Sequence, residues 1–186
     1  MFTRNMNLNN VIFLMLLIFF YSCNNNSNNQ EKVKNNKADI NKHLEDANSL
    51  YLKSEDLQIE DYIKRNALDV IKTGTGLRYF IYSNGSGDKV EENSIIRYHY
   101  KINLLNGWLC EESTNTGPVE IKIGSDNIIS GLEEGLRLLR AGDKAKFIVP
   151  SHLAYGWIGD SKNIPTRAVL VYDVNVLQVR KLKSEF

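Results

Sequence analysis

The C-terminal part of the chain combines one strongly periodic helical segment with a series of short strand-like segments, and this pattern restricts the fold most. The helical segment, residues 129–140, reads ISGLEEGLRLLR, with Leu132, Leu136 and Leu139 at i, i+4 and i+7. The Ala-Gly-Asp sequence that follows is typical of a helix end. A single short helix of this kind can cover one face of a sheet.

Segments rich in β-branched and aromatic residues lie on both sides of this helix. Asn106-Gly107 favours a hairpin turn between two of them. Strands and helices do not alternate as they would in a doubly wound parallel sheet, so the pattern predicts an α+β fold, a bent antiparallel sheet around one short helix. We expect strands at residues 77–84, 94–105, 108–112, 119–123, 144–149 and 168–179.

The N-terminus carries an unbroken apolar run, residues 11–21, VIFLMLLIFFY, after a positively charged Arg4. Spanning a bilayer takes about 20 apolar residues, so this run is typical of a signal peptide and not of a membrane helix. It ends in Phe-Tyr-Ser-Cys, with the cysteine at position 23, which resembles the lipobox of bacterial lipoproteins. An ordinary secretory signal with a coincidental cysteine is the alternative.

The lipobox resemblance implies that residues 1–22 are a lipoprotein signal peptide and that Cys23 is acylated. Two acyl chains are what stable membrane anchoring needs. We therefore expect a membrane-anchored lipoprotein in a bacterial cell envelope, facing the periplasm. The Asn-rich residues 23–36 show no apolar periodicity and predict a polar tether between membrane and domain.

Apolar residues return at helical spacing over residues 37–72, first at Ile40, Leu44, Ala47 and Tyr51 and then between 59 and 71. A capping signal at Ser54 favours two helices, broken near residues 53–54. The second helix is expected to pack on the domain that follows. The alternative is that these N-terminal helices are a dimerisation arm and the protein is a homodimer.

Composition excludes several classes of function. The chain has 23 Lys and Arg against 22 Asp and Glu, a formal net charge of +1, which argues against a nucleic-acid partner. Two cysteines exclude a disulfide scaffold and a zinc site of paired cysteines. His43, His99 and His152 have no metal-ligand spacing, so we expect neither metal nor cofactor.

Three segments together resemble the FKBP-type peptidyl-prolyl cis-trans isomerase family. They are RYHYKINLLNG (97–107), IISGLEEGLRLLRAGDKAKFIVP (128–150), and the run from Ala-Tyr-Gly (154–156) through Ile-Pro (164–165) to LVYDVNVL (170–177). The resemblance implies an isomerase domain over residues 73–186 that accelerates X–Pro rotation in proline-containing polypeptide clients. These would be exported proteins, and the reaction needs no nucleophile, metal or cofactor.

The resemblance also implies a proline pocket. Ile129 would donate its backbone N–H to the substrate, Tyr155 would offer its hydroxyl, and Glu111 would bind the hydroxyl of Tyr100. Two further positions, Cys110 and Val119, stand where the family has aromatic wall residues. The implied substrate-binding residues are Ile128, Leu132, Ile164, Tyr172, Val119 and Cys110.

Leu132 stands where the family often has a tryptophan as the pocket floor. This less aromatic cup predicts reduced catalysis and weak macrolide binding. A rival hypothesis follows, in which the pocket holds a segment of a partner protein and the domain is a non-catalytic chaperone or binding module. The tyrosines at 100 and 155 favour the enzyme.

Overall fold

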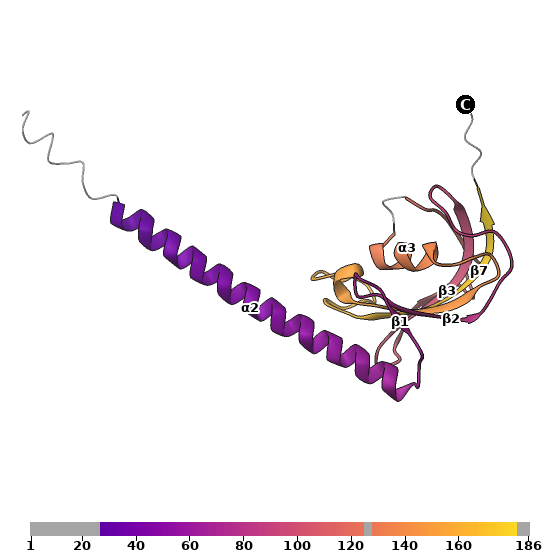
Figure 1. Cartoon of the computed structure of the whole chain (residues 1–186), viewed down its shortest axis with the longest axis horizontal. Coiled ribbons are helices and arrows are strands. Elements are labelled where there is room, and N and C mark those ends of the chain that lie inside the picture. The colour runs from indigo at the N-terminus through magenta and orange to yellow at the C-terminus, as the bar shows by residue number, and fades with distance from the viewer. Residues whose placement is uncertain (1–26, 125–127, 182–186) are drawn as a thin grey trace, which may run out of the picture. The chain divides into compact units, whose positions relative to one another are not determined.

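The computed structural model of this 186-residue chain describes residues 27–124 and 128–181, with side chains from residue 39 onward. The chain divides into two compact units, Met1–Tyr51 and Leu52–Phe186. Figure 1 shows the elements of each. The predicted signal peptide, 1–22, and Cys23 lie outside the described residues.

Helix α2 (Ser27–Arg65) runs through both the expected tether and the expected helix break. The predicted break at residues 53–54 is wrong, because good helix formers flank Ser54 on both sides and continuing the helix costs little. Residues 27–36 of the Asn-rich segment are helical too. The helix ends at Arg65 instead of 72, and Ile71–Lys72 form strand β1 by pairing with β2.

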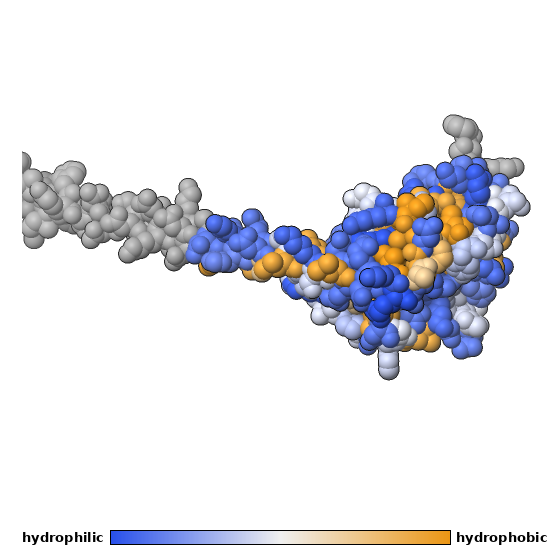
Figure 2. Space-filling model, turned by 60° about the horizontal axis from the view of Figure 1, so that its bottom comes forward, coloured by the Kyte–Doolittle hydropathy of each residue, from blue (hydrophilic) through white to orange (hydrophobic). Residues whose placement is uncertain are grey.

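In the first unit, the structure describes side chains for helix residues 39–51. Ile40, Leu44 and Leu50 are 57%, 63% and 67% exposed, and Figure 2 shows apolar side chains at the surface of the helix. His43 lies 3.6 Å from Asp39, one helical turn away. Within the described part of the chain, no helix is both long and apolar enough to cross a membrane.

The second unit is built on a seven-stranded antiparallel sheet with the order β1-β2-β6-β7-β3-β4, in which β5 also pairs with β3. Its long central strands pair over almost their whole length. The six predicted strand segments are all confirmed to within about three residues. The bounds are β2 (Arg78–Ser83), β3 (Ile95–Leu104), β4 (Leu109–Glu112), β5 (Val119–Lys122), β6 (Lys144–Val149) and β7 (Leu170–Arg180).

Helix α3 (Ser130–Arg137) lies in the hollow of the curved sheet (Figure 1), which confirms the predicted α+β fold. Leu132 and Leu136 of this helix are buried, and Leu139, which lies just beyond the helix end at Arg137, is fully inaccessible as well. Two glycines on the same face let the helix approach the sheet closely. A Cβ at Gly131 would lie 2.4 Å from a methyl of Val149, and one at Gly135 would lie 2.8 Å from the ring of Phe147.

The last turns of α2 pack on the other face of the sheet, as expected for the second helical stripe. Ile59 is 1% exposed and clusters with Ile148 and Val169. Ile148 follows Phe147 in β6, so the two side chains point to opposite faces. A buried arginine, Arg78, adds a polar contact here, because its guanidinium donates to carboxylates of the same helix.

Candidate functional site

Strand β3 contributes three side chains to one face of the sheet. Tyr98, Tyr100 and Ile102 alternate along the strand, so all three point into the hollow beneath α3. Ile102 lies opposite Tyr172 of β7 and opposite Glu111 of β4. These three residues therefore form a row across neighbouring strands, which explains why distant parts of the sequence meet at one place.

The loop that carries Tyr155 follows the short 3-10 helix η1 (Ser151–Leu153). The carbonyl of Ser151 accepts the N–H groups of Ala154 and Gly156 at 3.1 and 2.9 Å, so the chain folds back around Tyr155. The N–H of Ser151 donates to the buried carboxylate of Glu55 at 3.1 Å. Tyr155 is 37% exposed and stands at the rim of the hollow.

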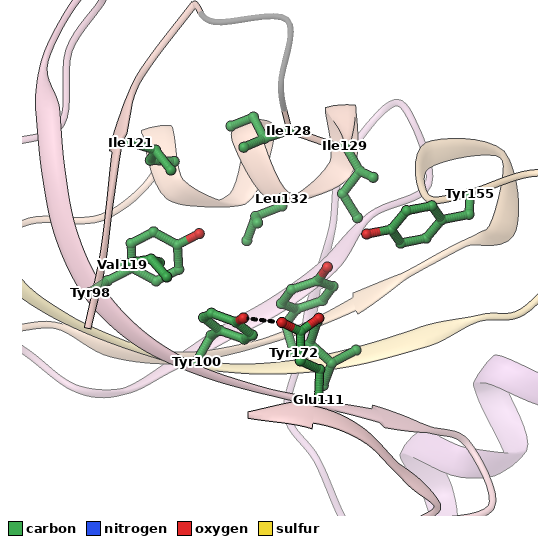
Figure 3. Close-up of a pocket in the computed structure, with 11 residues that line it drawn as sticks. Tyr98, Tyr100, Glu111, Val119, Ile121, Ile128, Ile129, Leu132, Tyr155 and Tyr172 are labelled. Carbon is green, nitrogen blue, oxygen red and sulfur yellow. Dashed lines mark hydrogen bonds between the residues drawn. The ribbon is translucent and has the colours of Figure 1, made fainter. Parts of the chain in front are cut away.

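A cavity of about 400 Å³ lies between β3, β5, the N-terminal end of α3 and this loop. Figure 3 shows the side chains that converge on it, with hydroxyl groups pointing inward. Its lining is apolar except for tyrosine hydroxyls and one carboxylate. The lining residues are Tyr98, Tyr100, Ile102, Glu111, Val119, Ile121, Ile128, Ile129, Leu132, Tyr155 and Tyr172.

All but two of the residues proposed from sequence line this cavity. The exceptions are Cys110 and Ile164, which are 7% and 4% exposed and belong to the main hydrophobic core. Their loops lie next to each other, since the side-chain amide of Asn163 donates to the carbonyl of Cys110 at 3.1 Å. These two side chains are therefore buried next to the pocket and are not among the residues that line the cavity, so their part in substrate binding stays a prediction.

Three lining residues were missed from the sequence: Tyr98, Ile102 and Ile121. Strand alternation carries the signal that finds them. Tyr98 and Ile102 lie two positions on either side of Tyr100, and Ile121 lies two positions after Val119. Once one pocket residue of a strand is known, its i±2 neighbours on that strand are candidates.

One hydrogen bond orders the polar side of the cavity. The hydroxyl of Tyr100 donates to Oε1 of Glu111 at 2.5 Å, drawn as a dashed line in Figure 3. Burial and this bond both raise the pKa of Tyr100 well above its ordinary value. Tyr100 is therefore protonated at neutral pH, and its hydroxyl donates a hydrogen bond to the carboxylate of Glu111.

The other pocket tyrosines are protonated as well. Burial raises the pKa of Tyr98 to about 12 and also raises the pKa values of Tyr155 and Tyr172. Their hydroxyls find no hydrogen-bond acceptor among the described residues, and neither does the backbone N–H of Ile129 at the start of α3. The cavity thus offers several donors in an apolar setting. Among the described residues, no three His, Cys, Asp or Glu side chains gather in a group that could hold a metal ion.

A ligand that suits this cavity is small, apolar and rich in acceptors. Proline meets this description, because its ring is apolar and its nitrogen carries no hydrogen, while the neighbouring carbonyls accept hydrogen bonds. The geometry therefore fits a proline-containing peptide segment.

Comparison with known proteins agrees with this geometry. Residues 87–177 match the family model of the FKBP-type peptidyl-prolyl cis-trans isomerases. A probable FKBP-type isomerase of Haemophilus influenzae is 39% identical over 118 residues, which are 63% of this chain and 48% of that protein. The isomerase FkpA of Aeromonas hydrophila is 37% identical over 125 residues, 66% of this chain and 46% of that protein. The chain thus spans about half the length of these curated relatives.

Solved structures share the fold. The crystal structure of AtFKBP13 superposes with a TM-score of 0.57 at 25% identity, covering 59% of this chain and 98% of that one. FkpA from Escherichia coli superposes with a TM-score of 0.61 at 24% identity, covering 96% of this chain and 84% of that one. Through residues 87–177, this chain belongs to the FKBP-type peptidyl-prolyl cis-trans isomerase family.

Proposed function

We propose that this protein accelerates cis/trans rotation about X–Pro peptide bonds in polypeptide clients. The observation that carries the proposal is the cavity itself, an apolar hollow in which several hydrogen-bond donors have no acceptor among the described residues. Rotation has a barrier of about 18–20 kcal/mol, because resonance stiffens the C–N bond. The planar amide is more dipolar than the twisted one, so an apolar cavity destabilises the planar form relative to the twisted form.

Five of the pocket residues have a part in this mechanism. The hydroxyl of Tyr155 and the backbone N–H of Ile129 have no acceptor among the described residues, and they orient the peptide through its carbonyl oxygens. Glu111 fixes the ring of Tyr100, so that side chain forms a rigid wall. Leu132, which is 5% exposed, provides an aliphatic surface against which the proline ring of the substrate packs. No nucleophile is needed, because no covalent bond is broken.

The proposal is tested by a proline-isomerisation assay on the full chain in detergent, beside Tyr155→Phe and Leu132→Trp. Loss of the Tyr155 hydroxyl removes one orienting donor, and we expect kcat/KM to fall about threefold to tenfold. Leu132→Trp adds a flat aromatic surface for the ring, and we expect kcat/KM to rise. A wild-type rate no faster than buffer, with Leu132→Trp also inactive, excludes the enzyme.

A second function, binding of a partner or unfolded client without catalysis, has one observation in its favour. Trp157 and Ile158, which follow Tyr155 in the same loop, are 64% and 79% exposed. Exposed side chains of this size next to Tyr155 in the chain extend the apolar surface available to a bound polypeptide. Trp157→Ala with Ile158→Ala separates the two functions: weaker suppression of aggregation with an unchanged isomerisation rate assigns these residues to binding alone.

We also propose that the protein is anchored through acylated Cys23 and acts on exported proteins in a bacterial envelope. The apolar run followed by Ser-Cys supports this. Cys23→Ser should release the protein from the membrane fraction and abolish incorporation of labelled palmitate.

The exposed Ile40 and Leu44 support a homodimer through the N-terminal helix. Sedimentation of the wild type and of an Ile40→Asp/Leu44→Asp variant would test this.

A further inference from the structure

Two pocket tyrosines place their hydroxyls deep in the cavity without a hydrogen-bond partner among the described residues. Tyr172 is 2% exposed and Tyr98 is 3% exposed, and neither hydroxyl bonds to another described residue. Among the described residues, the side-chain polar atoms that are sealed from solvent and unpartnered are Glu55 Oε2 and Arg78 Nε. The two tyrosine oxygens are thus not sealed in the core, and both residues line the cavity, as Figure 3 shows.

Hydroxyls this deep are normally hydrogen-bonded, because leaving a buried polar group unpaired is unfavourable. A phenylalanine at position 172 would fill the same space in the row formed with Ile102 and Glu111, without an unpaired group. The described residues supply no acceptor for the hydroxyl of Tyr172, and a ligand that enters the cavity can supply one.

Tyr172 lies near the other polar groups of the pocket. After burial, which is the main cause, the nearby Tyr155, Tyr98, Glu111 and Tyr100 all contribute to raising its pKa. Figure 3 shows its oxygen pointing up from the sheet toward the space between the rim and α3. Because the phenol keeps its proton throughout the physiological pH range, it is a hydrogen-bond donor there.

The depth of Tyr172 restricts which ligand atom it can meet. The rim donors, Tyr155 and the N–H of Ile129, are placed for the carbonyl oxygens outside the ring. A group at the bottom faces the proline ring, in which every atom except the nitrogen is carbon. In the planar peptide the nitrogen lone pair is delocalised into the carbonyl and accepts no hydrogen bond. When the bond twists, the lone pair is localised and becomes an acceptor.

We propose that the hydroxyl of Tyr172 is a catalytic donor to the imide nitrogen of the twisted X–Pro bond. This inference rests on the proposed isomerase function and deepens it. The hydroxyl is unpaired while the peptide is planar and paired at the transition state, so the interaction lowers the barrier without tightening binding of the ground state. The proton stays on Tyr172, and no covalent bond forms or breaks.

The test compares Tyr172→Phe with Tyr82→Phe in the full chain. Tyr82 is a matched control, because its hydroxyl donates to Asp173 at 2.5 Å and it does not line the cavity. We expect Tyr172→Phe to lower kcat/KM about threefold to tenfold, the value of one hydrogen bond. Its Kd for the same proline peptide, measured by titration, should be unchanged or tighter, and its Tm should not fall. Tyr82→Phe should keep wild-type kcat/KM.

Two kinds of result overturn the inference, and they are distinguishable. If the wild type is active and Tyr172→Phe has the same kcat/KM, the hydroxyl does not act at the transition state and only this inference fails. It fails in the same way if kcat/KM and peptide affinity fall by the same factor, because the hydroxyl then binds the ground state equally. If the wild type itself is inactive, the proposed function fails and the catalytic donor fails with it.

Discussion

Replacing Gly135 by alanine tests whether the close approach of α3 to the sheet holds the pocket in shape. A Cβ at this position would lie 2.8, 2.9 and 2.9 Å from three ring atoms of Phe147. Phe147 is fully buried, so its ring has no free space into which it can move. The helix must shift away from β6, or the ring must leave its preferred rotamer.

Two opposing effects set the size of the change. Alanine is a better helix former than glycine by about 0.8–1.0 kcal/mol. Overpacking a close-packed core costs about 1–3 kcal/mol. We therefore expect Gly135→Ala to lower the free energy of unfolding by roughly 1 kcal/mol, which shifts Tm down by about 2–8 °C for a unit of this size. Leu132 moves with the helix, so kcat/KM should fall as well.

Gly74→Ala is the control for this prediction, because nothing lies within 4 Å of a Cβ at Gly74 and its φ is not positive. Alanine there restricts the unfolded chain, and we expect a neutral effect or a gain of about 0.4–1 kcal/mol. Urea denaturation followed by tryptophan fluorescence measures both variants. A Gly135→Ala protein as stable as Gly74→Ala would show that the contact with Phe147 does not limit the position of α3.

Two further predictions concern the contacts of α2 within the second unit. Glu55→Ala leaves the buried N–H of Ser151 without its acceptor, but it also removes a carboxylate whose other oxygen is unpaired. We therefore expect urea denaturation to show a free energy of unfolding lower by about 1 kcal/mol. Stability equal to that of the wild type would contradict this. The pKa of Asp56 is lowered, chiefly by its hydrogen bond to Arg78, so its stabilising contribution is fully present above the ordinary value of 3.8 and is lost as pH falls through the lower, folded-state value. The Tm values of the wild type and Asp56→Asn should converge at the acid end of a series from about pH 2 to about pH 6, which brackets the reference carboxyl pKa values. A constant difference in Tm across that range would refute the assignment.

Much of the fold could be predicted because its signals are local. The leucine spacing of residues 129–140 and the alternating strands require only neighbouring residues, and they are retained in α3 and β2–β7. The break expected at Ser54 was also based on a local signal, and it was wrong. A cap signal describes a local preference, and strong helix formers on both sides outweighed it. Strand β1 escaped prediction because two residues carry no periodicity and depend wholly on pairing with β2.

The pocket was predicted in part, and the misses follow from side-chain direction. Cys110 and Ile164 belong to the right segments, yet their buried side chains are not among those that line the cavity. Tyr98 was overlooked although it shares the strand face of Tyr100. The cavity beside Tyr98 forms only when β5, β7 and α3 pack around strand β3. The burial of Tyr98, and the lack of a partner for its hydroxyl among the described residues, depend on that packing.

By itself, the sequence determined the class of fold and the helix that covers the sheet, because periodicity depends on residues close together in the chain. Most of the residues that line the cavity followed from the resemblance of three segments to the FKBP-type family. Apart from the bond between Tyr100 and Glu111, which the resemblance implied, only the tertiary structure decided which polar groups are paired. Glu55 and Ser151 lie 96 positions apart, and Tyr172 has no partner at all among the described residues. Hydrogen bonding depends on distance in space, and distance in space is set when the whole domain has packed.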